Sequence, residues 1–427
     1  MARTTGCGTR TSIALVQTRT TTSGCVPLSL AAEWAVRSRL HGEAHRKRSL
    51  IPCRKAKDKY WIAASSASAS KRRSSFLKGE EMPKTYGDLW PRITDIDNIY
   101  RAYLAARDKK REKPEVLAYD SHREENLITA HNELVWHMWK PRPFREFIVC
   151  EPKKRLIHAP QFSDRVIHHA LVRVIEPLFE RKMISNSFAC RKGLGTHKAV
   201  STAQKYARAV STKFGRFWFL KGDIHHYFPS IDHEALKKII RRTVRDKDTL
   251  WLIDTIIDES GFPGVGLPIG TLTSQLFANI YLDAFDHYMK DVLGIKYYLR
   301  YMDDFIIFSD NKSELKGVLT SARQWLKTNL NLTLNHKTRI ISDAEGCDFC
   351  GYRIWATHRL PRKRNVTRIH RRMKKLCRMY LKGNIPAENV CAVWSSFLGY
   401  MKHCDGYRTK LTLWQELNKI LKEDRKC

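Results

Sequence analysis

The chain has 427 residues, enough for two or three domains with a sizeable core. Lys and Arg outnumber Asp and Glu by 77 to 43, which favours a polyanionic partner, although a solvated basic surface would have the same composition. No run is apolar enough to span a membrane, no lipidation motif is present, and the 11 cysteines lack the spacing of a disulfide framework, so we expect a reducing, cytoplasmic setting and no membrane partner.

Residues 1–81 differ from the rest of the chain. They are rich in Thr, Ser, Ala and Arg, show little apolar periodicity, and hold 16 Lys or Arg against 5 Asp or Glu. A basic nucleic-acid-binding arm or a targeting peptide fits this composition. However, Lys-Gly-Glu-Glu-Met at 78–82 can be encoded as AAA-GGA-GAA-GAA-ATG, a good bacterial ribosome-binding sequence before a start codon. We therefore expect Met82 to be the natural start and residues 1–81 to be disordered or translated from upstream DNA.

Residues 82–140 are predicted to form a basic helical extension. In "IDNIYRAYLAARDKKREKPEVLAY", Ile99, Tyr100, Tyr103 and Leu104 recur at helical spacing before the segment becomes strongly basic. The next segment, "HREENLITAHNELVWHMWK", predicts a second helix.

The segment "REFIVCEPKKRLIHAP" alternates like two strands joined by a basic turn. It is followed by "DRVIHHALVRVIEPLFERKM", an amphipathic helix with Pro177 inside it or near its end. We interpret His168 and His169 in this helix as packing or backbone-capping residues and not as metal ligands.

In "FWFLKGDIHHYFPSIDHEAL" an apolar run ends at Asp223, and Asp232 has the position of a helix N-cap. Asp223 is therefore predicted at the end of a buried strand. His225 and His226 are expected to point to opposite sides of this strand end, which makes them a poor chelating pair. No metal is assigned to them.

The segment "YYLRYMDDFIIFSD" predicts a β-hairpin with Asp303 and Asp304 at its turn. A strand-end carboxylate at Asp223 and two turn carboxylates would supply three hard oxygen ligands, which suit Mg²⁺. The alternative is a solvent-exposed turn. Cys347 and Cys350 form a single CxxC without a convincing second pair, so we do not predict zinc there and leave their role open.

These segments resemble the reverse transcriptases, in which an aromatic-x-Asp-Asp hairpin faces an upstream strand-end Asp. Other blocks of that family follow in order: "EPKKRLIHAP", "FACRKGLGTHKAV", "GLPIGTLTSQLFANIYLDAFD", "LTLNHKT" and "FCGYRI". The resemblance runs from Arg142 to Tyr352. It implies an α+β right-hand polymerase: fingers and an antiparallel palm in residues 141–345, a primer-grip hairpin in 346–361, and a helical thumb in 362–427.

The block from Ile269 to Gln275 reads IGxxxSQ, where group II intron enzymes and retrons usually have QGxxxSP. This pattern, like the segment that starts at Met82, resembles the enzymes of diversity-generating retroelements. That group implies an RNA template copied with errors at adenines, a small basic accessory variability protein, and a bacterial or phage origin. We expect no endonuclease, RNase H or large maturase extension, because the chain stops soon after the thumb.

The resemblance also implies roles for single residues, with deoxynucleoside triphosphates, template RNA and a cDNA/RNA duplex as ligands. Two Mg²⁺ ions, for which Mn²⁺ can substitute, would be held by Asp223, Asp303, Asp304 and the Ile224 carbonyl. Lys337 would be a general acid for pyrophosphate departure, unless it is a plain surface lysine. Nucleotide-binding positions would be Lys153 (or Lys154), Arg155, Phe228, Ile269, Gly270 and Gln275. Nucleic-acid contacts would come from Arg191, Tyr301 and Gly351.

Several of these positions have a simpler reading. The fingers cations, Lys153 and Arg155, can simply bind the RNA backbone. Phe228 can pack in the core beside Tyr227, and Gln275 can be a hydrogen-bonded polar residue at the start of a helix. For the whole chain, the alternatives are a group II intron-like or phage-defence reverse transcriptase, or a catalytically inactive RNA-binding maturase. The intact Asp223, Asp303 and Asp304 favour an active enzyme over the last of these.

Overall fold

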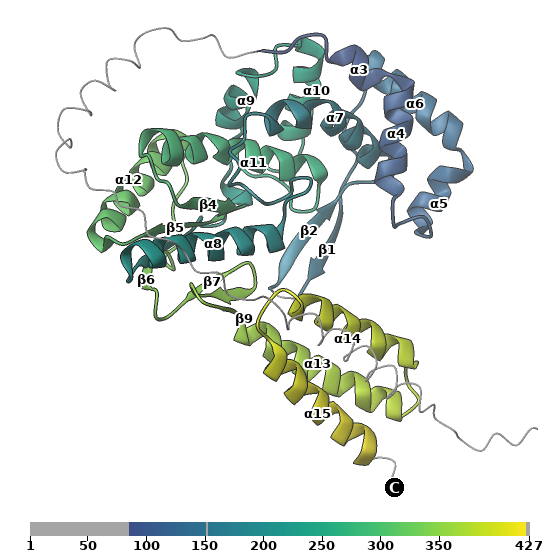
Figure 1. Ribbon diagram of the computed structural model, residues 1–427. Coiled ribbons are helices and arrows are strands. Elements are labelled where there is room, and N and C mark those ends of the chain that lie inside the picture. Colours follow the sequence, from purple (N-terminus) through teal and green to yellow (C-terminus); the bar gives the residue numbers. More distant parts are fainter. Residues whose placement is uncertain (1–84, 151–152, 424–427) are drawn as a thin grey trace, which may run out of the picture. The chain divides into compact units, whose positions relative to one another are not determined.

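The computed structural model describes residues 85–150 and 153–423 (Figure 1). Every described residue belongs to one compact unit, which spans residues 80–427. The expectations for residues 1–81 and for a start at Met82 therefore lie outside the described residues.

The described chain begins with a layer of helices, as its periodicity predicts. In α4 the buried positions include Ile99 and Tyr103, while Tyr100 and Leu104 of the same helix are exposed by 41% and 36%. The apolar stripe is therefore narrower than the spacing of all four residues suggested. The four helices are α3 (Trp90–Thr94), α4 (Ile96–Arg107), α5 (Pro114–Ser121) and α6 (Arg123–Val135).

The predicted pair of strands and the long helix after it are both present. Strands β1 (Arg145–Val149) and β2 (Arg155–Ala159) pair antiparallel, and the loop between them contains Lys153 and Lys154. Helix α7 (Phe162–Glu180) contains Pro177 in its last turn and is buried along much of its length. It packs against both α4 and α11 (Leu272–His287), and so joins the N-terminal helices to the rest of the fold.

A four-stranded antiparallel sheet forms the centre of the fold, in the order β4-β5-β3-β6. Alternate residues of its strands enter two separate cores: Phe219 of β3 belongs to one and Leu220 to the other. The sheet is therefore covered on both faces, which confirms the predicted α+β class. The strands are β3 (Trp218–Asp223), β4 (Tyr298–Tyr301), β5 (Asp304–Ser309) and β6 (Arg339–Ser342).

Helix α8 (Thr196–Phe214) covers one face of this sheet, whereas α11 and α12 (Lys312–Leu330) pack on the other (Figure 1). Two more helices, α9 (His233–Arg241) and α10 (Lys247–Asp258), pack on each other and follow a short 3₁₀ turn, η2 (Phe228–Ser230). Asp232 caps α9 as predicted, because its side chain accepts a hydrogen bond from the Ala235 amide. A π-helical turn, η3 (Tyr288–Val292), extends α11.

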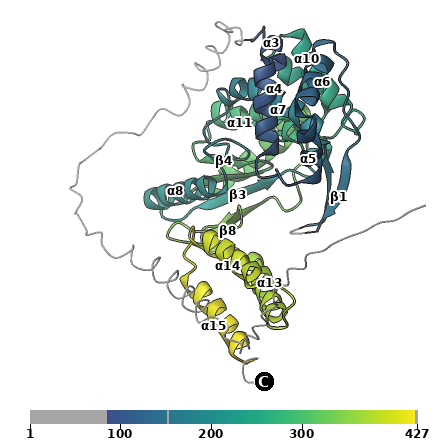
Figure 2. The same ribbon diagram turned by 90° about the vertical axis from the view of Figure 1, so that its right-hand side faces the viewer.

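A second, three-stranded sheet and three helices complete the described chain. The sheet consists of β7 (Cys347–Phe349), β8 (Tyr352–Ile354) and β9 (Arg359–Pro361). Helices α13 (Lys363–Leu381), α14 (Ala387–Met401) and α15 (Tyr407–Glu423) pack on one another as a bundle (Figure 2). Within residues 85–150 and 153–423, no helix is long and apolar enough to cross a membrane.

Candidate active site

Three carboxylates meet where the two central strands of the large sheet end. Asp223 is the last residue of β3, Asp304 is the first residue of β5, and the two are direct partners in the antiparallel register. The Ile224 amide donates to the Asp303 carbonyl at 3.3 Å, which ties the chain after β3 to the turn before β5. The predicted hairpin, and the predicted position of Asp223 at a strand end, are both confirmed.

The turn that carries Asp303 has a constrained backbone. Met302 and Asp303 are the two residues between β4 and β5, and Met302 has φ = +56°, in the left-handed region that glycine favours. Two-residue hairpin turns need a positive φ because their twist then matches that of the strands. The turn therefore holds a non-glycine residue in a costly conformation directly before the first of the adjacent carboxylates.

The electrostatics of these carboxylates favour a bound cation. Burial, and then the negative charges of Asp304 and Asp223, raise the pKa of Asp303 to about 6. Burial also raises the pKa of Asp304, although the ammonium of Lys221, 3.9 Å from its Oδ1 atom, partly offsets this. A cation at this edge of the sheet would relieve the repulsion among the three groups.

The donor set fits Mg²⁺ because it consists of hard carboxylate oxygens. In the part of the chain that the structure describes, no group of three or more His, Cys, Asp or Glu side chains is gathered to hold a metal ion by itself. Mg²⁺ does not require such a cage, since it usually keeps several waters and binds one or two carboxylates plus substrate phosphates. Cys347 and Cys350 are poor metal ligands here, because burial raises the pKa of both thiols.

The two predicted fingers cations lie within electrostatic reach of the carboxylates. The charge of Arg155 lowers the pKa of Asp303, and the charge of Lys153 lowers that of Asp304, each in opposition to the larger effect of burial. Both cations are exposed, so a negatively charged ligand can reach them. The structure therefore brings the basic end of the β1–β2 hairpin and the carboxylates to one site.

The loop before α11 is fixed to strand β2. The His158 amide of β2 donates to the Ile269 carbonyl at 2.9 Å. Gly270 has φ = +128°, and a Cβ atom there would lie 2.8 Å from Cγ2 of Ile157. Glycine is thus required here by the conformation and by the approach of β2, a reason that sequence reasoning did not give. Gln275 is half-buried in the first turn of α11, for which Thr271 is the N-cap.

Phe228 and Lys337 are both near Asp223. Phe228 follows it by five residues in the chain, and Lys337 lies in a turn that is hydrogen-bonded to it. Phe228 is half-buried, and its ring centroid is 5.7 Å from that of Tyr227, so it packs on the core while part of it faces outward. Lys337 is exposed in a turn that is attached to β3, because the Asn335 amide donates to the Asp223 carbonyl at 2.7 Å. The assigned roles of both residues stay predictions.

Tyr301 and Gly351 both lie at the second, three-stranded sheet. The Tyr301 hydroxyl is 3.0 Å from Oγ1 of Thr196, and its ring meets Phe349 edge-on. Gly351 has φ = +89° in the turn between β7 and β8, and its carbonyl accepts hydrogen bonds from the Arg362 amide and the Tyr400 hydroxyl. Gly351 therefore joins this turn to α13 and α14; its contact with nucleic acid stays a prediction.

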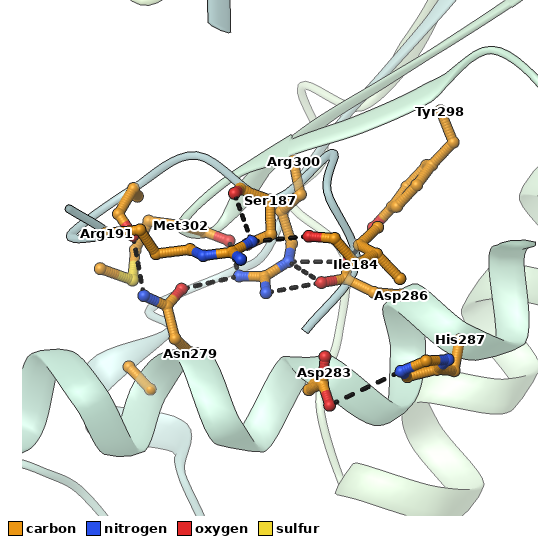
Figure 3. A network of polar contacts seen from close by, with 12 residues as sticks. Ile184, Ser187, Arg191, Asn279, Asp283, Asp286, His287, Tyr298, Arg300 and Met302 are labelled. Carbon is orange, nitrogen blue, oxygen red and sulfur yellow. Dashed lines mark hydrogen bonds and ion pairs between the residues drawn. The ribbon is translucent and has the colours of Figure 1, made fainter. Parts of the chain in front are cut away.

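Arg191 is placed differently from what we expected. Its side chain is only 8% exposed, and its guanidinium binds Glu180. The same guanidinium donates to the carbonyls of Ile184 and Ser187 (Figure 3). These protein contacts use all three guanidinium nitrogens. The arrangement does not support the predicted contact with template or triphosphate, and instead gives Arg191 the task of fixing its own loop.

The geometry predicted for His225 and His226 is wrong. The pair lies in a turn after β3, His226 has φ = +43°, and the two ring centroids are 4.2 Å apart. Strand alternation does not apply because the strand already ends at Asp223. His168 is buried as expected of a packing residue, and burial lowers its pKa to about 3.

Sequence reasoning missed three charged residues beside the carboxylates: Lys221, Asp286 and Arg300. Arg300 is completely buried in β4, and Asp286 is completely buried in α11 (Figure 3). The sequence did contain a sign of these residues. Lys221 and Arg300 each interrupt an apolar strand, two residues before Asp223 and three residues before Asp303. A charged side chain in such a position has to find a partner.

Part of the chain is similar in sequence to a known protein family and to several known proteins. Residues 146–354 match the family described as Reverse transcriptase (RNA-dependent DNA polymerase). Protein YkfC from Escherichia coli (strain K12) is 27% identical over 282 residues, which are 56% of this chain and 72% of that protein. Group II intron-encoded protein LtrA from Lactococcus lactis subsp. cremoris is 28% identical over 188 residues, 42% of this chain but only 30% of that protein. A solved structure of apo telomerase from Candida Tropicalis covers 71% of this chain and 62% of its own, with a TM-score of 0.42 and 12% identity.

Proposed function

Because residues 146–354 form a reverse transcriptase domain with the right-hand polymerase fold and with homologues among group II intron proteins, we propose that the chain is an RNA-directed DNA polymerase. The observation that carries this proposal is the meeting of Asp223, Asp303 and Asp304 opposite the fingers cations Lys153 and Arg155. The ligands are template RNA, the growing cDNA/RNA duplex and deoxynucleoside triphosphates.

The residues of the site have separate tasks in nucleotidyl transfer. Asp223, Asp303 and Asp304, with the Ile224 carbonyl, would hold two Mg²⁺ ions, which when bound supply Lewis-acid stabilisation of the attacking and leaving oxygens. Arg155 can grip the triphosphate through a bidentate fork, while Lys153 neutralises charge as a point cation.

Two further residues act on other parts of the nucleotide. Lys337 gives a proton to the departing pyrophosphate. Phe228 closes against the sugar, where a flat ring leaves no space for a 2′-hydroxyl.

A double substitution tests the polymerase assignment. Asp303→Asn with Asp304→Asn removes two ligand charges with little change of shape, so it should abolish Mg²⁺-dependent primer extension while leaving folding and RNA binding intact. Primer extension on an RNA template measures the polymerase activity, circular dichroism measures folding, and filter binding measures RNA binding. Extension at a near wild-type rate in the double variant would refute the assignment of these carboxylates.

We further propose that the enzyme is the error-prone polymerase of a diversity-generating retroelement, with a small basic accessory protein as partner. The support is the block from Ile269 to Gln275, in which an apolar residue precedes Gly270. Ile has no hydrogen-bonding group to lose beside a mispair, and sites that discriminate by hydrogen bonding reject wrong partners better than apolar sites do. Ile269→Gln should therefore lower misincorporation opposite template adenine. Sequencing cDNA copied from one adenine-rich RNA by both forms decides this, because equal error spectra would contradict it.

A second candidate is a group II intron-like reverse transcriptase or maturase, which is favoured by the match to LtrA. The neighbouring DNA separates the two candidates. A near-repeat pair that differs at adenines supports the retroelement, whereas the catalytic RNA domains of an intron support the second candidate. A protein that binds RNA tightly but never extends a primer would be a non-catalytic maturase.

A further inference from the structure

A buried ion pair lies directly beneath the carboxylate turn. Arg300 of β4 and Asp286 of α11 are both completely buried. The guanidinium meets the carboxylate with two nitrogens, Nε at 2.7 Å from Oδ1 and Nη2 at 2.7 Å from Oδ2. Such a bidentate pair has a fixed direction as well as a strong attraction, so the position of the guanidinium is determined by α11.

The remaining donor group of this guanidinium is directed at the turn. Nη1 of Arg300 donates to the Met302 carbonyl at 3.0 Å and to Oδ1 of Asn279 at 3.2 Å (Figure 3). Met302 is the turn residue with a positive φ, and Asp303 follows it directly. A strained non-glycine conformation persists only where its surroundings impose it, and this hydrogen bond is such a constraint.

The same network holds the loop that precedes α8. The Asn279 side chain, which accepts from Arg300, also donates to the Ala189 carbonyl at 2.8 Å. The backbone of Arg300 pairs with the same loop, since its amide donates to Asn186 and its carbonyl accepts from Phe188. The loop, the turn and α11 therefore share one set of contacts centred on Arg300.

Stability alone does not explain this pair. Replacing a buried ion pair by apolar residues of similar size is often neutral or stabilising, so a buried pair is weak support for a stabilising role. The direction of Nη1 is informative, because besides Asn279 it binds the backbone carbonyl of Met302, which directly precedes Asp303. The contact is suited to keeping Asp303 and Asp304 in place.

We propose that Arg300, oriented by Asp286 and Asn279, is a positioning residue that fixes the Met302 carbonyl and thereby aims Asp303 and Asp304 at the metal ions. This role rests on the proposed polymerase function. It predicts a loss of metal affinity and of kcat, and no change in the KM for template–primer, because the turn is moved and the nucleic-acid surface is not.

Two variants test the role. Arg300→Met with Asp286→Asn removes both charges together and leaves an amide oxygen that can still accept from the Tyr298 hydroxyl, which donates to Asp286 at 2.6 Å. Arg300→Lys keeps the charge beside Asp286, but a single ammonium cannot make the bidentate pair and also reach Met302. In both variants kcat and the affinity for Mn²⁺, measured by electron paramagnetic resonance, should fall by about 10- to 100-fold.

A matched control distinguishes positioning from general destabilisation. Arg142 and Asp164 also form an ion pair, 2.8 Å long, in which Asp164 is 1% exposed. This pair joins the segment before β1 to helix α7, and its hydrogen bonds do not include any residue of the network around Arg300. Arg142→Met with Asp164→Asn should lower the melting temperature and leave kcat and Mn²⁺ affinity unchanged.

The outcomes separate this inference from the proposed function. An inactive wild-type protein would overturn the polymerase proposal, while Mn²⁺ titration would still report how the turn is held. If the double variant does not fold, Arg300→Lys supplies the same measurements. Wild-type kcat and Mn²⁺ affinity in Arg300→Lys, or equal losses in the Arg142 control, would overturn the positioning role.

Discussion

Replacing Asp303 by Asn should stabilise the folded protein at neutral pH even though it removes a carboxylate of the candidate active site. Burial and the neighbouring carboxylates raise the pKa of Asp303 from 3.8 to about 6, so its ionised form is disfavoured in the fold. Two pKa units correspond to about 3 kcal/mol. Since Asp303 is only half-buried, water screens part of this cost, and we expect a gain of about 2 kcal/mol at pH 7.5.

The pH dependence follows from the direction of the shift. As pH rises, the unfolded state releases this proton first, so wild-type stability falls between pH 4 and pH 6 while that of Asp303→Asn does not. The advantage of the variant should therefore be about half as large near pH 5 as at pH 7.5. Urea denaturation without metal at the two pH values measures both quantities.

Two additional measurements complete this test. Asp310→Asn makes the same chemical change at an exposed position just after β5 and should leave stability nearly unchanged. Added Mg²⁺ should stabilise the wild type more than Asp303→Asn, because an ion bound only by the folded carboxylates favours the folded state. A destabilised Asp303→Asn, or a gain that does not depend on pH, would refute the reasoning.

Three other predictions follow from the site. Gly270→Ala should lower the free energy of unfolding, measured by urea denaturation, by about 1–3 kcal/mol, because its φ is +128° and the Ile157 side chain would lie 2.8 Å from the new methyl group. The control Gly317→Ala, inside α12 where no atom lies within 4 Å, should be neutral or stabilising. An unchanged stability of Gly270→Ala would contradict the argument. Phe228→Ala should lower the preference for deoxyribonucleotides by at least about tenfold in single-nucleotide extension, whereas unchanged selectivity would leave Phe228 a packing residue. Template binding should weaken steeply with salt, and replacing the exposed Arg371 and Lys375 of α13 by Gln should reduce the log–log slope by more than about one unit; an unchanged slope would show that α13 does not contact phosphates.

The elements that carry the carboxylates follow from the residues next to them in the chain. Asp223 at the end of one apolar run, and Asp303 with Asp304 between two others, place acids at strand ends because alternation and turn chemistry are local properties of the chain. The β1–β2 hairpin and the cap at Asp232 were equally readable from neighbouring residues.

Roles that depend on a distant partner were not readable in this way. Arg191 looked like a ligand-binding cation in its motif, but the fold directs it at Glu180 and two carbonyls of its own loop. The requirement for Gly270 comes from β2, more than a hundred residues earlier in the chain. The side chains of His225 and His226 do not alternate between the two faces of the sheet, because the strand ends before them.

Which charges compensate one another depends on how the strands and helices pack. Arg300 and Lys221 each interrupt an apolar strand, which shows that a partner is required but not which one it is. The partner of Arg300 is Asp286 on helix α11, which packs on the sheet, and that of Lys221 is Asp304 on a neighbouring strand. A buried charge is stabilised by whatever packing brings within hydrogen-bonding distance, and that distance is set by how strands and helices assemble, which local sequence patterns do not specify.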